Sequence, residues 1–432
     1  MSDENCVLAY SGGLDTSAIV PWLVDQGYDV HAILVDVGQQ EDLAAACEKA
    51  LQHGAATAVV CDAKPAMFEH IIPFAIGLAA TYEGNYRLGT ALARPFIALE
   101  QVKLARQLGG AALVHGATGK GNDQIRFEFA YQSLAPEYPV LAPWKVWDYG
   151  GRSDLINYLE SKGLDGDYEV QKDYSLDENL WHLSVEGGPL EQPDQIVDVD
   201  QVLNAVAGHF AWGYPLEKAS SAVEIQFEAG VPVALDGLEM SLADIVQQLN
   251  HHYRLAPWAW DLIIENRFTG IKSRGLYINP AAKLLHLAVD NLARTCFNKP
   301  TYDRYVKLGQ EYGELLYRGE YFTDQRVVVE AAGQVLMNHL NGSVTVQLQP
   351  TPFVAKISNP KSIFTKDGAT FEESDYCHQD AAGFIKLSWA NNIGKPFAEE
   401  NHGVVVEAKS SAASGICAAE PVPAGGLVSP SV

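Results

Sequence analysis

The chain has 432 residues, a length that favours two or three domains and leaves room for sizeable hydrophobic cores. Its 30 lysines and arginines stand against 54 acidic residues, and the net charge of −24 argues against a polyanionic partner such as tRNA or DNA. The longest apolar stretch, residues 70–80, is too short to span a membrane and contains Pro73, so we expect no membrane role.

The first half of the sequence alternates short apolar runs with helical patterns. We expect strands at 5–10, 30–36, 57–61 and 111–115, and helices at about 16–26, 41–53, 66–80 and 95–108. Strands that alternate with helices at this spacing form a parallel sheet covered on both faces. The predicted fold class is therefore α/β, with a doubly wound, Rossmann-like parallel sheet.

The pattern changes after about residue 170. Residues 222–237 alternate like a β-hairpin, residues 241–252 and 302–319 are typical of helices, and residues 342–357 are typical of strands. These elements predict a second, α+β domain. From Glu407 onward the sequence is rich in Ala, Ser, Pro and Gly, which is typical of a disordered tail. The predicted boundaries are 1–170 for the first domain, 171–400 for the second and 401–432 for the tail.

The cysteines and the start of the chain bear on its location. The acidic start MSDENC lacks the apolar core of a signal peptide, so we expect no export. The six cysteines lie far apart and form no C-x-x-C pair, which favours reduced thiols in the cytoplasm. Neither the cysteines nor the twelve histidines show metal-site spacing, so the sequence predicts no metal cluster.

The first predicted strand runs into the stretch LAYSGGLDTS, residues 8–17. Gly12 and Gly13 permit positive φ and close approach to the backbone, and the following helix adds free N–H groups and the positive end of its dipole. Such a turn binds an anion, most simply phosphate. The same residues also fit an ordinary strand–helix turn in which Asp15, Thr16 or Ser17 only caps the helix.

This loop differs from the common nucleotide-binding loops. A P-loop needs a lysine directly after its glycines, and no lysine follows Gly13 before Lys49; the G-x-G-x-x-G spacing is also missing. The pattern S-G-G-x-D instead resembles that of the ATP pyrophosphatases, which hold the β,γ-pyrophosphate of ATP and release it after attack at the α-phosphorus. Pro21 removes a helical hydrogen bond and predicts a kink or a late helix start.

A second polar loop, VHGATGKGNDQIRFE at 114–128, follows another predicted strand. It leaves the same edge of the sheet as S-G-G-L-D, where α/β sheets bind ligands. Asp123 could bind an ammonium group, Thr118 or Asn122 could donate to a carboxylate, and Arg126 could hold a carboxylate with two hydrogen bonds. This set suits an amino acid beside a nucleotide, although each residue alone also fits a solvated loop.

Five blocks in the same order resemble the argininosuccinate synthase family: LAYSGGLDTS, YRLGTALARP, HGATGKGNDQIRFE, SLDENLWHLS and IIENRFTGIKSRGLY. The likeness runs from about residue 5 to 395. It implies a ligase of arginine biosynthesis that joins citrulline to aspartate with ATP, through a citrullyl-AMP intermediate, giving argininosuccinate, AMP and pyrophosphate. It further implies Mg²⁺ with the ATP, a second domain for synthesis and multimerisation, and a cytoplasmic homotetramer.

The resemblance also assigns residues to ligands. ATP would contact Ala9, Tyr10, Ser11, Gly12, Gly13, Leu14, Asp15, Thr16, Ser17, Val35 and Gly116, and Asp15 would assist catalysis through magnesium. Aspartate would contact Thr118, Asn122 and Asp123. Citrulline would contact Tyr86, Asn122, Arg126, Ser175, Ser184, Glu265 and Tyr277.

Two departures from the family pattern matter. Ala91 stands where the family commonly has serine, which removes one hydrogen bond expected at citrulline; the loss of a neutral hydrogen bond costs about 1 kcal/mol. Residues 388–403 contain asparagine, glycine and proline where helix formers would be expected. The C-terminal helix that joins subunits of the tetramer is therefore expected to be short.

The chemistry leaves two alternatives to this ligase. One is another S-G-G-x-D enzyme acting on a citrulline-like acceptor, such as a tRNA-modifying or amidating enzyme; the net charge and the lack of paired cysteines or a glutaminase half disfavour it. The other is an ATP-binding sensor without catalysis, which the presence of Asp15, Asp123 and Arg126 disfavours. Lys272 and Arg274 are candidates to balance phosphate charge or members of a solvated turn.

Overall fold

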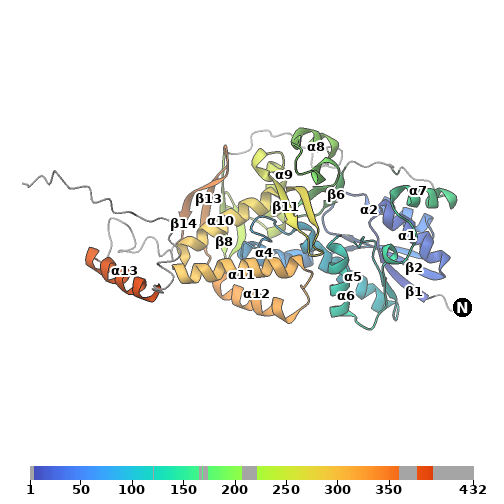
Figure 1. Ribbon diagram of the computed structural model, residues 1–432, viewed down its shortest axis with the longest axis horizontal. Coiled ribbons are helices and arrows are strands. Elements are labelled where there is room, and N and C mark those ends of the chain that lie inside the picture. The colour runs from blue at the N-terminus through green and yellow to red at the C-terminus, as the bar shows by residue number, and fades with distance from the viewer. Residues whose placement is uncertain are drawn as a thin grey trace, which may run out of the picture. The chain divides into compact units, whose positions relative to one another are not determined.

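The computed structural model describes residues 4–119, 121–164, 168, 174–206, 221–359 and 377–392 (Figure 1). Residues 1–366 belong to one unit and residues 367–432 to another. Within the described part, no helix has the length and hydropathy needed to cross a membrane. The predicted tail, 401–432, lies outside the described residues.

A five-stranded parallel sheet organises the first half of the chain, as predicted. Its strand order is β3-β2-β1-β4-β5, and all its pairings are parallel. The strands are β1 (Glu4–Ala9), β2 (Tyr28–Asp36), β3 (Thr57–Asp62), β4 (Ala112–Val114) and β5 (Val140–Leu141). The helices are α1 (Leu14–Asp25), α2 (Leu43–Gln52), α3 (Lys64–His70), α4 (Ile72–Gly77), α5 (Gly89–Gln107), α6 (Asp123–Leu134) and α7 (Arg152–Ser161).

The alternation of side chains along β1 explains why helices cover both faces of this sheet. Cys6 and Leu8 belong to one buried core together with Ile19 of α1. Val7, between them, belongs to a second core together with Val102 of α5. Both faces are apolar and need cover, so ligand access is left to the strand ends.

Two prolines changed the helix boundaries that the sequence predicted. The helix expected at 66–80 is divided into α3 and α4, because Pro73 lies at the start of α4, where its missing N–H costs nothing. The helix expected at 95–108 begins earlier, at Gly89, and includes Pro95. Both errors arise because a proline in the sequence can mark the start of a helix or lie within one.

Pro21 does not delay the start of α1, contrary to the sequence-based expectation. The helix begins at Leu14 and continues through Pro21. The carbonyl oxygen of Ser17, which would have accepted the missing N–H of Pro21, accepts a hydrogen bond from Nδ1 of His53 at 2.9 Å. A side chain from the end of α2 therefore supplies the donor that proline lacks.

The second half of the same unit contains two antiparallel sheets. One has the order β10-β9-β8-β13-β14 and the other the order β11-β12-β7-β6. The strands of the first are β8 (Ala222–Glu228), β9 (Val231–Leu235), β10 (Leu238–Glu239), β13 (Gly342–Gln347) and β14 (Phe353–Ser358). Those of the second are β6 (Ser175–Glu178), β7 (Leu183–Glu186), β11 (Trp260–Asn266) and β12 (Lys272–Ile278).

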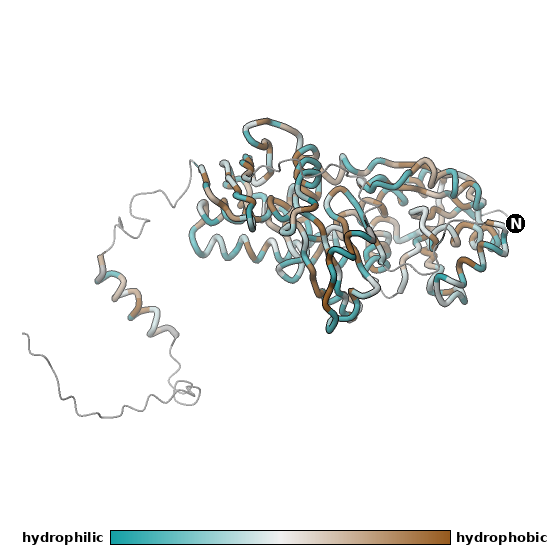
Figure 2. The backbone as a smooth tube through the Cα atoms, turned by 90° about the horizontal axis from the view of Figure 1, so that it is seen from above, coloured by the Kyte–Doolittle hydropathy of each residue, from teal (hydrophilic) through white to brown (hydrophobic). Residues whose placement is uncertain are grey.

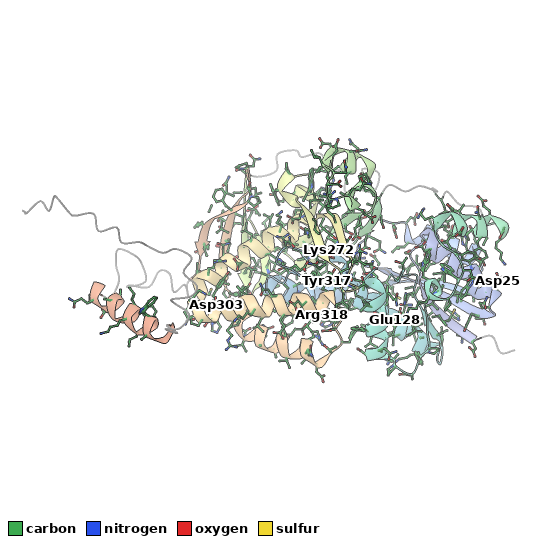
Figure 3. All side chains as sticks on the ribbon, viewed as in Figure 1. Asp25, Glu128, Lys272, Asp303, Tyr317 and Arg318 are labelled. Atoms are coloured by element: carbon green, nitrogen blue, oxygen red, sulfur yellow. The ribbon has the colours of Figure 1, made fainter. Side chains whose placement is uncertain are left out.

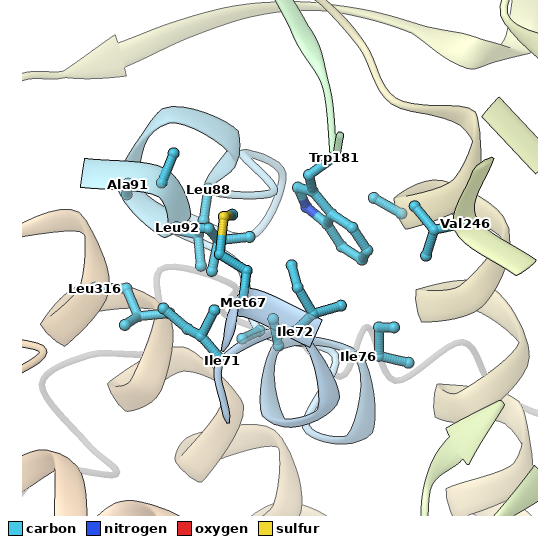
Figure 4. Close-up of a cluster of buried hydrophobic side chains, with 14 of the residues drawn as sticks. Met67, Ile71, Ile72, Ile76, Leu88, Ala91, Leu92, Trp181, Val246 and Leu316 are labelled. Carbon is cyan, nitrogen blue, oxygen red and sulfur yellow. The ribbon is translucent and has the colours of Figure 1, made fainter. Parts of the chain in front are cut away.

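Helices complete this α+β part, and its hairpin, helices and final strand pair occur where the sequence predicted them. They are α8 (Val199–Val206), α9 (Leu242–Tyr253), α10 (Pro280–Cys296), α11 (Lys299–Tyr317) and α12 (Asp324–Met337). A buried cluster joins residues of both halves, including Met67 of α3, Leu92 of α5, Val246 of α9 and Leu316 of α11 (Figure 4). One continuous core therefore holds the two halves together.

The second unit is described only through α13 (His378–Asn392). The helix includes the first residues of the segment that the sequence predicted to be a poor helix, and residues 393–403 lie outside the described part. It carries both hydrophobic and hydrophilic residues (Figure 2). Four large apolar side chains of α13 are each more than 60% exposed: Phe384, Ile385, Leu387 and Trp389.

Two glycines allow α11 to approach the backbone that follows α4. A Cβ at Gly309 would overlap the carbonyl oxygen of Leu78, and a Cβ at Gly313 would overlap that of Thr81. These glycines lie one helical turn apart and therefore on one face of α11. The close approach fixes α11 against the segment that carries Tyr82.

We predict that Gly313→Ala lowers the free energy of unfolding by about 1–2 kcal/mol. Overpacking against the fixed backbone at Thr81 costs about 1–3 kcal/mol, against a helix-propensity gain of at most about 1 kcal/mol. Urea denaturation measures the difference. Gly383→Ala is the control, because α13 has open space around that position. Equal or greater stability of Gly313→Ala would contradict the packing argument.

Candidate active site

The S-G-G-L-D loop is a tight turn held by its own hydroxyl groups. Gly12 has a φ of +75°, and Gly13 is the N-cap of α1 without a side-chain cap hydrogen bond. Ser11 Oγ lies 3.1 Å from Thr16 Oγ1, and Ser17 Oγ donates to the carbonyl oxygen of Gly12 at 3.3 Å. None of Asp15, Thr16 and Ser17 is the N-cap residue, so the alternative in which one of them caps α1 is not what the structure shows.

A lysine from another helix reaches this loop. Lys49 of α2 donates from Nζ to the carbonyl oxygen of Gly12 at 3.0 Å. Its ammonium also lies 4.2 Å from the ring centroid of Tyr168. The motif lacks the lysine of a P-loop, but the next helix in the chain brings a cation to the backbone of the loop.

One cleft of about 560 Å³ joins the loop to the second half of the chain. It collects residues from the ends of β1 and β2, the start of α6, and β6, β7 and β11. Most of the residues assigned to ligands from the sequence line it: Ala9, Tyr10, Ser11, Gly13, Asp15, Thr16, Val35, Tyr86, Gly116, Thr118, Asn122, Asp123, Arg126, Ser175, Ser184 and Glu265.

Four of the assigned residues do not line the cleft. Gly12 and Ser17 take part in the hydrogen bonds of the loop, and Leu14 packs in an apolar cluster with Leu155 of α7. Tyr277 lies behind the wall, with its ring centroid 5.0 Å from that of Tyr86.

A partly buried chain of opposite charges forms the middle of the cleft. Arg94 of α5 binds Asp123 through Nε at 2.9 Å and Asp177 of β6 at 3.1 Å. Arg126 donates to the other oxygen of Asp123 at 2.9 Å. Burial alone would raise the pKa of Asp123, but Arg94 and Arg126 lower it below its ordinary value. Thr90 donates to Asp177 at 2.6 Å and completes the chain.

Glu265 and Glu186 form a second acidic group across the cleft. Burial, together with the neighbouring Glu186, raises the pKa of Glu265 to about 6. Arg267 opposes this effect, pairing with Glu186 and lying 3.7 Å from Glu265 Oε1. Tyr317 donates to Glu265 Oε2 at 3.1 Å. At neutral pH the carboxylate form of Glu265 therefore predominates and can accept further hydrogen bonds.

Asp15 is the carboxylate nearest in sequence to the loop glycines. Burial raises its pKa, and Arg152 partly offsets that effect. Among the residues that the structure describes, no group of three or more His, Cys, Asp or Glu side chains could hold a metal ion. A single carboxylate suits magnesium only where phosphate oxygens and water supply the other ligands.

Several residues of the cleft received no role from the sequence. Arg94, Asp177 and Arg267 stand inside the quoted motif blocks, but nothing in the sequence indicates that Arg94 pairs with Asp177 or that Arg267 pairs with Glu186. Tyr317 lies outside all five blocks, at the end of α11. Only the fold brings these side chains together.

The structure also shows the surroundings of three further residues that the sequence singled out: Lys272, Arg274 and Ala91. Arg274 donates to the carbonyl oxygens of Leu190 and Gln192, each at 2.6 Å, and Lys272 binds Asn266 at an exposed turn. Neither lines the cleft. Ala91 is fully buried in the large core (Figure 4), and Thr90 is the neighbouring residue that lines the cleft.

The parallel sheet with its S-G-G-x-D loop and the α+β part share one charged cleft, as in a two-part enzyme whose first part binds a nucleotide. A family model described as the arginosuccinate synthase N-terminal HUP domain matches residues 5–165, and one described as the C-terminal domain matches residues 174–392. The chain belongs to the argininosuccinate synthase family.

Curated relatives agree with these matches. The chain is 38% identical to the argininosuccinate synthase of Caldicellulosiruptor saccharolyticus over 390 residues, which cover 90% of this chain and 95% of the relative. It is 39% identical to that of Moorella thermoacetica over 389 residues, which cover 89% and 94%. The value for Leptospira biflexa is 39% over 388 residues, which cover 89% and 95%.

We predict that Lys49→Met raises the KM for ATP about tenfold or more. The substitution removes a charge-assisted hydrogen bond to the loop, worth about 1.5–3 kcal/mol, and a cation beside the loop that is expected to bind phosphates. Steady-state kinetics with varied ATP provide the measurement. Lys103→Met is the control, because Lys103 pairs with Glu100 on the surface of α5. An unchanged KM for ATP would show that Lys49 has no part in nucleotide binding.

Proposed function

We propose that this chain joins citrulline to aspartate with ATP in the cleft described above, releasing argininosuccinate, AMP and pyrophosphate. The single observation that carries this proposal is the continuity of the cleft, from the S-G-G-x-D loop to the polar faces of β6, β7 and β11. Membership in the argininosuccinate synthase family supports the same ligase activity, and it favours it over other S-G-G-x-D enzymes.

The loop end of the cleft suits the nucleotide. The free N–H groups at the start of α1 and the ammonium of Lys49 would stabilise the phosphates of ATP. Asp15 would hold Mg²⁺ together with phosphate oxygens, and the ion would neutralise charge on the departing pyrophosphate. Val35 and Gly116, which also line the cleft, would contact the adenosine.

The far end suits two amino acids. In the proposed assignment Thr118, Asn122 and Asp123 hold aspartate, and the citrulline residues are those assigned by the family resemblance, from Tyr86 to Tyr277. Arg126 donates from Nε to the carbonyl oxygen of Tyr317 and from Nη1 to Asp123. The guanidinium has five N–H groups, so these bonds still leave donors at its forked end for a carboxylate.

Two displacements complete the reaction. The ureido oxygen of citrulline attacks the α-phosphorus, and the bond from that phosphorus to the pyrophosphate breaks. The amine of aspartate, as a free base, then attacks the ureido carbon of citrullyl-AMP, the carbon–oxygen bond to AMP breaks, and the new nitrogen loses a proton. Alignment of three substrates in one cleft would supply much of the rate, together with stabilisation of developing charge.

We further propose a cytoplasmic homotetramer. The described cysteines Cys6, Cys47, Cys61, Cys296 and Cys377 are free thiols, which fits a reducing compartment. The exposed apolar residues of α13 would be covered by neighbouring subunits in an oligomer.

We predict that AMP and pyrophosphate form from ATP only when citrulline is present, and that argininosuccinate forms only when aspartate is added as well. The reason is that citrulline supplies the attacking oxygen and aspartate the displacing amine. Chromatography of the nucleotides, with a coupled pyrophosphate assay, measures both requirements. Release of ADP and phosphate would contradict the adenylation mechanism.

We predict that Arg126→Lys raises the KM for citrulline by about tenfold to a hundredfold and changes the KM for ATP much less. Lysine cannot reproduce a two-bond fork on a carboxylate, and a charge-assisted hydrogen bond is worth about 1.5–3 kcal/mol. Kinetics with each substrate varied in turn separate the two constants.

Arg106→Lys is the matched control, because Arg106 donates to the carbonyl oxygen of Leu134, outside the cleft. Equal losses for citrulline and ATP in Arg126→Lys would refute the assignment. They would show instead that Arg126 acts mainly by bracing Asp123, a contact that the structure contains.

A further inference from the structure

We propose that Tyr317 is a positioning residue for the citrulline site, where its hydroxyl group joins Asn122 on one wall of the cleft to Glu265 on the other. This inference rests on the proposed function, because it concerns the same cleft. Tyr317 lies at the end of α11, the helix that runs from the region of Asp303 to Tyr317 in Figure 3. It does not itself line the cleft.

The phenol oxygen makes two hydrogen bonds with residues assigned to citrulline. Asn122 Nδ2 donates to it at 2.7 Å, and it donates to Glu265 Oε2 at 3.1 Å. The carbonyl oxygen of Asn266 lies farther away, at 3.5 Å. A phenol has one proton to donate and can accept as well, so it can connect an amide donor to a carboxylate acceptor.

A backbone amide determines the orientation of Asn122. Phe268 donates its N–H to Asn122 Oδ1 at 2.9 Å. A backbone N–H can only donate, so the atom that it reaches must be the amide oxygen, and Nδ2 must face Tyr317. The direction of the whole chain of hydrogen bonds follows: from Asn122 to Tyr317 and from Tyr317 to Glu265.

The backbone of Tyr317 holds a third residue of the site. Arg126 donates from Nε to the carbonyl oxygen of Tyr317 at 3.0 Å, and its guanidinium carbon lies 5.0 Å from the centroid of the ring. Asn122, Arg126 and Glu265 are therefore all held by this one residue. The family resemblance assigns each of them to citrulline.

The packing of α11 keeps Tyr317 in place. Gly309 and Gly313, two turns and one turn earlier on the same face, lie against the backbone of Leu78 and Thr81. The ring of Tyr317 stacks on that of Tyr82, with centroids 3.6 Å apart and planes inclined by 4°. Because the ring and the helix are fixed in this way, the hydroxyl group is preorganised and costs little to order when substrate binds.

The pKa shifts of Tyr317 and Glu265 agree with a hydrogen bond that runs from the phenol to the carboxylate. Burial, and then the neighbouring Glu265, raises the pKa of Tyr317 well above its ordinary value, so the phenol keeps its proton. Burial and Glu186 raise the pKa of Glu265, while Arg126, Arg267 and the hydrogen bond from Tyr317 lower it. Removing the hydroxyl group would therefore raise the pKa of Glu265 further above about 6.

The test compares Tyr317→Phe with Tyr312→Phe, two changes on one helix. Tyr312 is also buried and also donates to a carboxylate, Glu330, at 2.9 Å, but Glu330 does not line the cleft, whereas Glu265 does. Phenylalanine keeps the ring in both variants, so the stack on Tyr82 remains. We expect Tyr317→Phe to raise the KM for citrulline about ten- to a hundredfold, with the KM for ATP changed less than about threefold.

The pH profile provides a readout that a merely structural role would not move. The acidic limb of kcat/KM for citrulline should shift to higher pH in Tyr317→Phe, because ionised Glu265 is the form that accepts hydrogen bonds. Tyr312→Phe should leave the limb in place. In the Glu265→Gln background, which has no carboxyl group to titrate, adding Tyr317→Phe should produce no further shift.

Equal increases in the KM values for citrulline and ATP, or an unshifted acidic limb, would overturn the inference. Thermal unfolding of the two variants identifies a general folding defect, and a Tyr317→Phe chain that fails to fold would also count against a positioning role. Failure of the proposed function would appear differently. The unmodified protein would then fail to form AMP and pyrophosphate from ATP, citrulline and aspartate.

Discussion

The partly buried pairing of Arg94 with two carboxylates is the interaction on which the cleft depends. Arg94 belongs to α5, Asp123 begins α6 and Asp177 lies on β6, so one guanidinium connects the parallel-sheet part to the antiparallel part. Each of these side chains is partly exposed, so the cost of breaking the pairing lies below the roughly 3–5 kcal/mol of a fully buried pair. The pairing favours the arrangement of the two halves in which these charges neutralise one another.

The same constraint separates the cleft into two chemical regions. At the loop, the start of α1 and Lys49 provide positive potential for phosphates. At the far end, Asp123, Glu186 and Glu265 alternate with guanidinium groups. Alternating charges of this kind suit amino acids, which carry an ammonium and a carboxylate within a few bonds of each other.

The sequence allowed the parallel sheet and its binding edge to be predicted, because both depend on local signals. Apolar runs such as the one around Val7 mark strands that are buried on both faces, and the glycines after Ala9 mark the turn to α1. The approach of Lys49 to Gly12 could not be predicted, because it depends on how α2 packs against the loop. The predicted helix limits near Pro73 and Pro95 were wrong, because a proline can lie either at the start of a helix or inside it.

Much of the site could be assigned from the sequence only through motif blocks, and the structure shows what those blocks omit. Arg94 and Arg267 stand within them, yet Asp123, a partner of Arg94, lies in another block, and Glu186, the partner of Arg267, lies in none. A carboxylate partner cannot be inferred from the identity of an arginine alone. Tyr317 gives no signal at all, since a tyrosine near the end of an amphipathic helix is ordinary. Its importance arises from the glycines before it, which bring its ring onto Tyr82.

The shared ion group has a consequence for how two amino acids would bind side by side. Asp123 holds both Arg94 and Arg126, and in the proposed assignment aspartate uses Asp123 while citrulline uses Arg126. A carboxylate bound to Arg126 would compete with Asp123 for that guanidinium. The carboxylate of Asp123 would then be less neutralised and would attract an ammonium group more strongly. The two substrates would therefore favour each other's binding through a pair of residues that already touch. Because coupling of this kind is reciprocal, the order in which the amino acids arrive would not alter its size.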